Sequence, residues 1–174
     1  REGTHIFLAN KSTRYFSKLF LIAGILFVSN NSFGKEIIIS PGSDAQDRLQ
    51  EAMILMDEGD TLVIKAGYYE FEDGLSLDVN NVTIKGDGMD KTILDFKSQK
   101  SGAQGLLVTS DRVTLKDFAI LDAKGDALKV IGSNGINMIN LRTEWTGGPK
   151  STNGAYGFYP VSYTHLRAHE TPVN

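Results

Sequence analysis

The chain has 174 residues, of which 41% are hydrophobic and 22% are charged, and its formal net charge is −3 at pH 7. This length suits one folded domain, and the lack of cysteine excludes a disulfide framework and lipid attachment through cysteine. Residues 35–161 hold 13 Lys and Arg against 19 Asp and Glu, a net charge of −6. Such an acidic domain argues against nucleic acid as a partner, and against acidic polysaccharide unless a cation such as Ca²⁺ bridges the two.

Residues 1–34 are predicted to be upstream residues followed by a signal peptide. In residues 11–34, three basic residues precede the apolar run Leu19–Val28, and small and polar residues follow it. This order is typical of secretory signals, and the run is shorter than the roughly 20 residues that span a bilayer. We expect an exported protein, periplasmic or extracellular, without a stable membrane anchor after cleavage.

A capping helix is predicted over residues 44–58, ahead of the first strand. Its apolar residues recur at helical spacing on one face. Ser43 with Gln46 has the spacing of a capping box, and Gly59 suits the position just past the helix end.

Three later stretches share one pattern of two turn residues followed by alternating apolar and polar residues. They are "DVNNVTIKG" (78–86), "TSDRVTLKD" (109–117) and "GSNGINMIN" (132–140). Alternation with period two marks a strand with one buried face, and unequal repeats of this kind indicate a solenoid. The fold predicted for residues 35–161 therefore stacks Val82, Val113 and Ile136 in one buried column.

The turn residues Asn80, Asp111 and Asn134 fall at one place in this repeat. Because Asn and Asp tolerate the left-handed backbone region, we expect them to take that conformation at a sharp bend. Their stacked side chains should hydrogen-bond along the column.

The segment "VTIKGDGMDKT" (82–92) is close to a phosphate-binding loop, but its spacing is wrong. Asp90, rather than Gly, precedes Lys91, and the following "ILDF" favours a strand over a helix. A glycine turn between two strands is the better interpretation.

The order of the helix, "GDTLVIKAGYY", "VTIKGDGMDKTILDF" and "VTLKDFAILDAKGDALKV" resembles right-handed parallel β-helix proteins of the pectate-lyase-like superfamily. More narrowly, the chain is similar to secreted bacterial proteins with parallel β-helix repeats, over about residues 36–161. The resemblance implies an all-β fold, a right-handed parallel β-helix (solenoid) of about three to four rungs with an N-terminal capping helix. It also implies binding or processing of a polysaccharide.

The catalytic patterns of the better-known branches are missing. The chain lacks the Asn-Thr-Asp and Gly-His-Gly segments of galacturonan hydrolases and the Asp-Pro-His-Asp of alginate epimerases. Enzymatic activity, which would be that of a polysaccharide lyase or a glycoside hydrolase, is therefore left open. The alternative is a non-catalytic structural or interaction β-helix at the cell surface or in the periplasm.

Candidate catalytic residues are the acidic side chains Asp95, Asp122 and Asp126, with Arg142 and Glu144 beside them. Asp95 and Asp122 are expected to stack on adjacent rungs, where paired carboxylates hold Ca²⁺ or divide the acid and base roles. The alternative is that these Asp residues end strands and start turns, and that Arg142 and Glu144 form an exposed ion pair. No metal ligand is assigned, and Ca²⁺ is the one cofactor left open.

Aromatic residues in the Gly-rich stretch "EWTGGPKSTNGAYGFYPV" (144–161) are candidates for substrate binding. They are Trp145, Tyr156 and Tyr159, whose flat rings suit the apolar face of a sugar. Packing against the core is the alternative for Trp145 and the favoured interpretation for Phe158.

Residues 162–174 break the pattern and are predicted to be a non-native tail. His165 and His169 are spaced like zinc ligands on a helix, but Leu166 stands where a zinc protease requires Glu. A metal site is not expected there.

Overall fold

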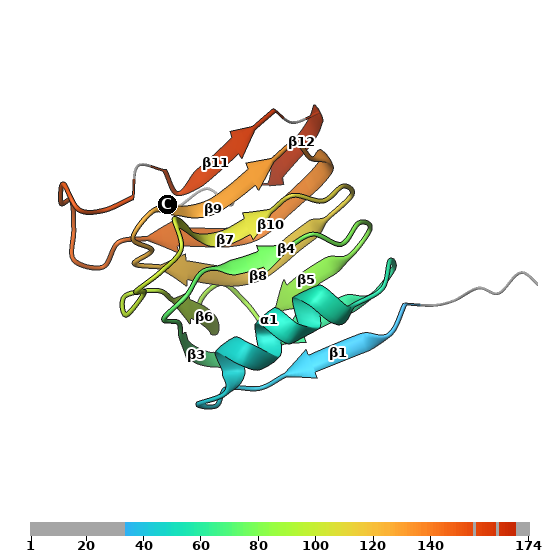
Figure 1. Cartoon of the computed structure of the whole chain (residues 1–174), viewed down its shortest axis with the longest axis horizontal. Helices are drawn as coiled ribbons and strands as arrows, with labels where there is room; N and C mark the ends of the chain where they lie inside the picture. Colours follow the sequence, from blue (N-terminus) through green and yellow to red (C-terminus); the bar gives the residue numbers. More distant parts are fainter. Residues whose placement is uncertain (1–33, 155, 163, 170–174) are drawn as a thin grey trace, which may run out of the picture. The chain divides into compact units, whose positions relative to one another are not determined.

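The structure is a computed structural model that describes residues 34–154, 156–162 and 164–169, all within the compact unit of residues 32–174. One helix, α1 (Ala45–Leu55), and twelve strands make up these residues (Figure 1). The strands are β1 (Glu36–Ile39), β2 (Thr61–Ile64), β3 (Gly67–Glu70), β4 (Leu75–Leu77), β5 (Thr83–Gly86), β6 (Thr92–Asp95), β7 (Gln104–Val108), β8 (Thr114–Leu121), β9 (Asp126–Ile131), β10 (Asn134–Glu144), β11 (Phe158–Val161) and β12 (Thr164–His169).

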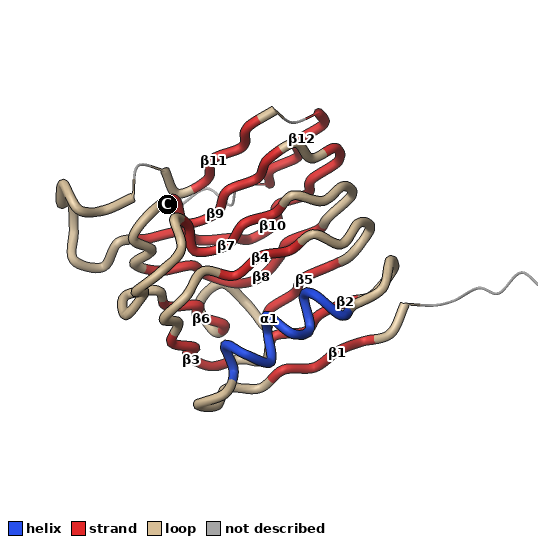
Figure 2. Tube along the Cα trace, viewed as in Figure 1, coloured by secondary structure: helices blue, strands red, loops and turns tan. Residues whose placement is uncertain are grey.

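The strands form three parallel faces, which the chain visits in the same order on each coil (Figure 2). Face A contains β1, β2, β5, the first part of β8, the first part of β10, and β12. Face B contains β3, β6 and the last parts of β8 and β10, and face C contains β4, β7, β9 and β11. β8 and β10 bend from face A to face B at Asp117 (φ 63°) and Asn140 (φ 49°). This arrangement confirms the predicted right-handed parallel β-helix.

The predicted column of inward aliphatic residues is present. Val82, Val113 and Ile136 are 2%, 0% and 1% exposed, and each directly precedes strand residues that pair in register. Aromatic residues stack in the same way, because the rings of Phe71 and Phe96 lie 4.8 Å apart on successive coils. One coil cannot bury these side chains alone, so the core depends on stacking.

A ladder of side-chain hydrogen bonds runs along the turn between faces C and A. Oδ1 of Asn80 accepts the N–H of Asp111 at 2.8 Å, and Oδ1 of Asp111 accepts the N–H of Asn134 at 2.9 Å. Oδ1 of Asn134 in turn accepts the hydroxyl of Thr164 at 2.7 Å. The predicted hydrogen bonding along the column is confirmed.

The left-handed backbone, however, falls one residue later than predicted. The positive φ angles belong to Asn81 (56°), Arg112 (54°) and Gly135 (80°), not to the ladder residues. The ladder residue has to aim its side chain at the coil above, so the bend is taken up by the residue after it.

Replacing Asn80 with alanine should lower the free energy of unfolding by about 1 kcal/mol, because the N–H of Asp111 loses its acceptor. Asn80→Asp retains an acceptor oxygen and is the matched control. Urea unfolding followed by circular dichroism measures the difference, and equal stability of the two variants would contradict the ladder's role.

Helix α1 covers the first coil, as predicted, but its N-terminus differs from the predicted capping box. Asp44 is the N-cap residue and makes no capping hydrogen bond through its side chain, and Met56 is the C-cap residue. The side-chain oxygen of Gln46 instead accepts the N–H groups of Glu72 (2.7 Å) and Asp73 (3.2 Å). These two bonds place the side chain of Gln46 on the turn after β3 and not at the helix end.

Residues 164–169 form β12, whose register follows β10, so His165 and His169 lie on a strand and not on a helix. The prediction that residues 162–174 are non-native stays a prediction, and residues 170–174 lie outside the described part. The predicted signal peptide also lies outside it, apart from Gly34. The helix of the described part, α1, is not long and apolar enough to cross a membrane.

Candidate functional site

The phosphate-loop-like segment is a turn, as predicted. Its residues 87–91 join β5 on face A to β6 on face B, and Gly88 among them has a φ of 141°. Asp87 accepts the N–H of Ala66 at 2.7 Å and pairs with Lys65 at 3.2 Å. These bonds connect the turn to the preceding coil. A phosphate bound at this turn would lie beside the carboxylate of Asp87, which would repel it.

A column of outward residues on face B brings acidic side chains together. In register, Glu70 lies opposite Asp95, Asp95 opposite Leu121, and Leu121 opposite Glu144. The carboxylates stacked on adjacent coils are thus Glu70 and Asp95. The expected stacking of Asp95 on Asp122 is wrong, because β8 continues through Leu121 and shifts Asp122 one residue beyond the register.

Asp122 instead organises the next turn. It has a φ of 53°, and its carboxylate accepts the N–H of Thr146 at 2.7 Å and the hydroxyl of Thr146 at 2.6 Å. This is the turn role that the sequence left as its alternative.

Asp95 is a buried carboxylate, 6% exposed, with a partner on each oxygen. The hydroxyl of Tyr68 donates to one oxygen, and the N–H of Lys97 donates to the other at 2.8 Å. The hydrogen bond to Asp95, together with burial and the nearby carboxylates, raises the pKa of Tyr68 to about 12. Tyr68 therefore stays a hydroxyl donor at neutral pH, while its side chain remains 53% exposed on face B.

The side chain of Arg142, on β10, extends back to the turn between β5 and β6. Its guanidinium pairs with Glu144, lies 3.6 Å from a carboxylate oxygen of Asp90, and donates to the carbonyl of Met89 at 3.3 Å. The ion pair with Glu144 matches the alternative left open for these two residues. Ala119 precedes Arg142 in the same column of face B and is fully buried.

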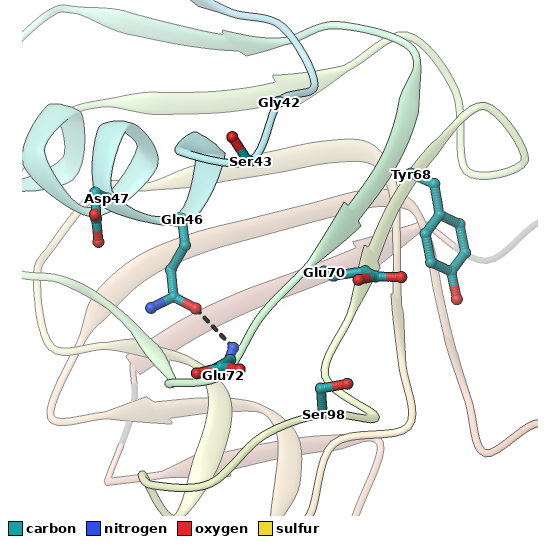
Figure 3. Close-up of a pocket in the computed structure, with 8 residues that line it drawn as sticks. All are labelled: Gly42, Ser43, Gln46, Asp47, Tyr68, Glu70, Glu72 and Ser98. Atoms are coloured by element: carbon teal, nitrogen blue, oxygen red, sulfur yellow. Dashed lines mark hydrogen bonds between the residues drawn. The ribbon is translucent and has the colours of Figure 1, made fainter.

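One cavity, of about 650 Å³, lies where face B meets the start of α1 (Figure 3). It is polar and acidic. Its lining residues are Gly42, Ser43, Gln46, Asp47, Tyr68, Glu70, Glu72 and Ser98. Lys100 pairs with Glu72 of this lining at 2.7 Å.

A second cavity, of about 470 Å³, lies under the loop between β10 and β11. Its lining residues are Thr143, Glu144, Trp145, Gly148, Pro149, Lys150, Asn153 and Gly154. The indole N–H of Trp145 donates to the carbonyl of Ala123 at 2.7 Å, and the ring packs on the core while also lining the cavity. Trp145 thus packs on the core and also faces a hollow of the surface.

The remaining candidates lie on face C. The rings of Tyr156 and Tyr159 stack 4.6 Å apart, and the ammonium of Lys129 lies 5.2 Å from the centre of the Tyr159 ring. Asp126 lies 4.0 Å from the same ammonium. Asp126 is therefore separated from Asp95 by a change of face, and the two do not form one cluster.

Sequence reasoning missed Tyr68 and Glu70, the two residues that complete the face B surface. The available signal was the alternation in "GYYEF", in which Tyr68 and Glu70 are the outward residues and Tyr69 is buried. Among the described residues, no group of three or more carboxylate or His side chains is placed to hold a metal ion. A bridging Ca²⁺ stays a prediction.

No protein-family model matches the chain, and no curated protein matches it. One similar solved structure is a pectin methylesterase mutant in complex with a hexasaccharide, with 13% identity and a TM-score of 0.49. The match covers 75% of this chain and 48% of that one. Another is a PL6 family alginate lyase, with 20% identity and a TM-score of 0.37, covering 78% of this chain and 18% of the lyase.

This chain thus spans about half the length of the esterase and under a fifth of the lyase. Its fold follows from its own geometry: three parallel faces, one register and buried columns that continue from coil to coil. The chain is a right-handed parallel β-helix.

Proposed function

We propose that the protein binds an extended polysaccharide along face B. The observation that carries the proposal is the register column of Glu70, Asp95, Leu121 and Glu144, which is buried at Asp95 and Leu121 and exposed at its two ends, because its first residue lines one cavity and its last lines the other. Three strand spacings, about 14 Å, separate these ends along the solenoid. A polymer fits two aligned hollows better than a single small molecule does.

The exposed groups at the two ends of this column suit sugars. Tyr68 offers a ring that is half exposed, and Glu70, Arg142 and Glu144 offer acceptors and donors for hydroxyl groups. Aromatic faces and a few oriented polar groups are typical of carbohydrate sites. Since the first cavity is lined by Asp47, Glu70 and Glu72, we expect sugars without carboxylates in this groove.

Binding is tested by affinity electrophoresis in gels containing β-glucan, xylan or galactomannan, followed by titration with the oligosaccharide of the retarding polymer. Tyr68→Ala and Arg142→Gln should each weaken binding about tenfold, because each removes a ring or a fork of donors from the surface. Ile54→Ala, on an exposed residue of α1, is the matched control and should bind as the parent does. Retardation by none of the polymers, or unchanged affinity in both variants, contradicts the proposal.

Cleavage of the bound polymer is a second candidate, favoured by the register pair of Glu70 and Asp95. Two adjacent carboxylates in unlike surroundings divide acid and base roles. Both oxygens of Asp95 already have partners, however, so binding is the primary proposal. Release of reducing ends that Asp95→Asn abolishes would decide for catalysis, and no release by the parent would decide for a non-catalytic role.

Export is part of the proposal and rests on the basic and apolar segment at residues 11–34. Fractionation of cells expressing the chain with a C-terminal tag should recover it outside the cytoplasm. Replacing Leu21 and Leu26 with Asp interrupts the apolar run and should retain the protein inside.

A further inference from the structure

Face C carries a pair of tyrosines that the face B groove does not use. The rings of Tyr156 and Tyr159 are stacked, with their centres 4.6 Å apart and an angle of 12° between their planes. Tyr159 belongs to β11, and Tyr156 lies in the loop two residues before this strand. Because the chain itself holds the two phenols together, each one meets the other at a high effective concentration.

The register of face C shows that the pair faces solvent. Tyr159 lies opposite Lys129, whose neighbours Leu128 and Val130 are buried, so Lys129 and Tyr159 both point outward. The ammonium of Lys129 lies 5.2 Å from the centre of the Tyr159 ring and stabilises this position of the ring. Since Tyr156 is 51% exposed, an oxidant in solution can reach the pair.

Two other tyrosines of the described residues, Tyr68 and Tyr69, follow each other in β3 but do not form such a pair. Successive side chains of a strand lie on opposite sides, so Tyr68 points outward while Tyr69 is 1% exposed. Both hydroxyls already donate, that of Tyr68 to Asp95 and that of Tyr69 to the carbonyl of Lys65 at 2.8 Å. Within the described residues, the pair on face C is therefore the place where two phenol rings stack.

We infer that Tyr156 and Tyr159 form a site of oxidative cross-linking, at which a peroxidase with hydrogen peroxide joins the two rings as dityrosine. Each phenol gives up one electron and its hydroxyl proton and becomes a phenoxyl radical. The radicals couple by a bond between one Cε of each ring, and the hydrogens on those two carbons move to the oxygens and restore both phenols. Hydrogen peroxide takes up the two electrons and two protons that are released and becomes two molecules of water.

The stacked arrangement leads to this product through small movements. The rings have to turn until one Cε of each meets the other, and the torsion that turns a Tyr ring has broad minima. Tyr156 lies in the loop and is free to make this turn, whereas Tyr159 is held in the ladder between β11 and β9. The product attaches the end of the loop over the second cavity to β11. The inference depends on the geometry of face C and not on the face B groove.

The test treats the full chain with a peroxidase and hydrogen peroxide, and follows dityrosine fluorescence and the intact mass. The parent should become fluorescent and lose the mass of two hydrogen atoms without joining a second chain. Tyr156→Phe and Tyr159→Phe each keep a ring in the stack but lack one phenol, so both signals should be lost. Tyr68→Phe removes an exposed phenol outside the pair, and this matched control should react as the parent does.

Peptide mapping assigns the bond. Trypsin leaves both tyrosines in the peptide of residues 151–167, which should carry the mass change. Tyr163 belongs to the same peptide, so Tyr163→Phe is included and should still form the product. Cross-linked dimers in place of the lighter single chain, or equal fluorescence from Tyr156→Phe, overturn the inference. The proposed function is tested separately, because Tyr156→Phe should bind neutral glycans as the parent does, whereas Tyr68→Ala should not.

Discussion

Replacing Phe96 with alanine is expected to lower the free energy of unfolding by about 3–5 kcal/mol. The ring is fully buried and stacks on Phe71 of the coil below, with centroids 4.8 Å apart and an angle of 18° between the planes. Alanine leaves a cavity between two coils, and the rigid stack on either side cannot close around it. Denaturant unfolding of parent and variant at the same protein concentration measures the loss.

Phe96→Leu is the matched control, because it keeps most of the buried volume and should lose about 1.5 kcal/mol. Ile54→Ala, 64% exposed on α1, should stay within about 0.5 kcal/mol of the parent. If Phe96→Ala lost no more than Ile54→Ala, the ring stack would not be part of a cooperative core.

Replacing Asp60 with alanine should cost about 2–4 kcal/mol, because two backbone N–H groups lose their acceptor. Asp60 is 3% exposed, and its oxygens accept the N–H groups of Lys35 and Asp57, each at 2.8 Å. The ammonium of Lys35 lies 3.4 Å from the same carboxylate but is half exposed, so it adds little. These bonds connect the residue before β1 and the residue after the C-cap of α1 to the start of β2. Thermal unfolding of Asp60→Ala beside Asp60→Asn, which retains one acceptor, measures the loss. Equal stability of the two variants would contradict this account.

The same carboxylate gives a pH dependence with a definite sign. Burial raises the pKa of Asp60, but the hydrogen bonds from Asp57 and Lys35 outweigh burial, so the pKa lies below its usual 3.8. A lowered pKa in the folded state stabilises the protein above the unfolded pKa, and this stability is lost as the pH falls through the folded pKa. The free energy of unfolding should therefore fall less steeply below about pH 4 in Asp60→Asn than in the parent. Equal slopes would show that Asp60 has the same pKa in both states.

The sequence was sufficient for the solenoid because each coil repeats its own local pattern. Val82, Val113 and Ile136 each follow a polar bend and begin an alternating run, so their burial and alignment are readable without any structure. The capping box was not readable in the same way. Gln46 had a competing use at the turn after β3, which only the folded coil brings near.

The composition of the face B surface also escaped sequence reasoning, because register depends on turn lengths. "ILDF" and "ILDA" look alike, but the coil that joins them is one residue shorter than the interval between the two Asp residues. Asp95 therefore lies opposite Leu121 on one side and Glu70 on the other. Its acidic neighbour is Glu70, which stands in the different local sequence "GYYEF". Local similarity predicts which residues face outward, but not which of them become neighbours.

The corner between faces B and C is the place where the chain tolerates segments of different length. Successive coils pass from B to C through residues 71–74, 96–103, 122–125 and 145–157, while the strands on both sides keep their register. Extra length at this corner projects outward and leaves the buried columns in place. Foreign peptides grafted into residues 147–153, between the core-packed Trp145 and β11, should therefore be carried without unfolding the scaffold, and new recognition properties can accumulate there independently of stability.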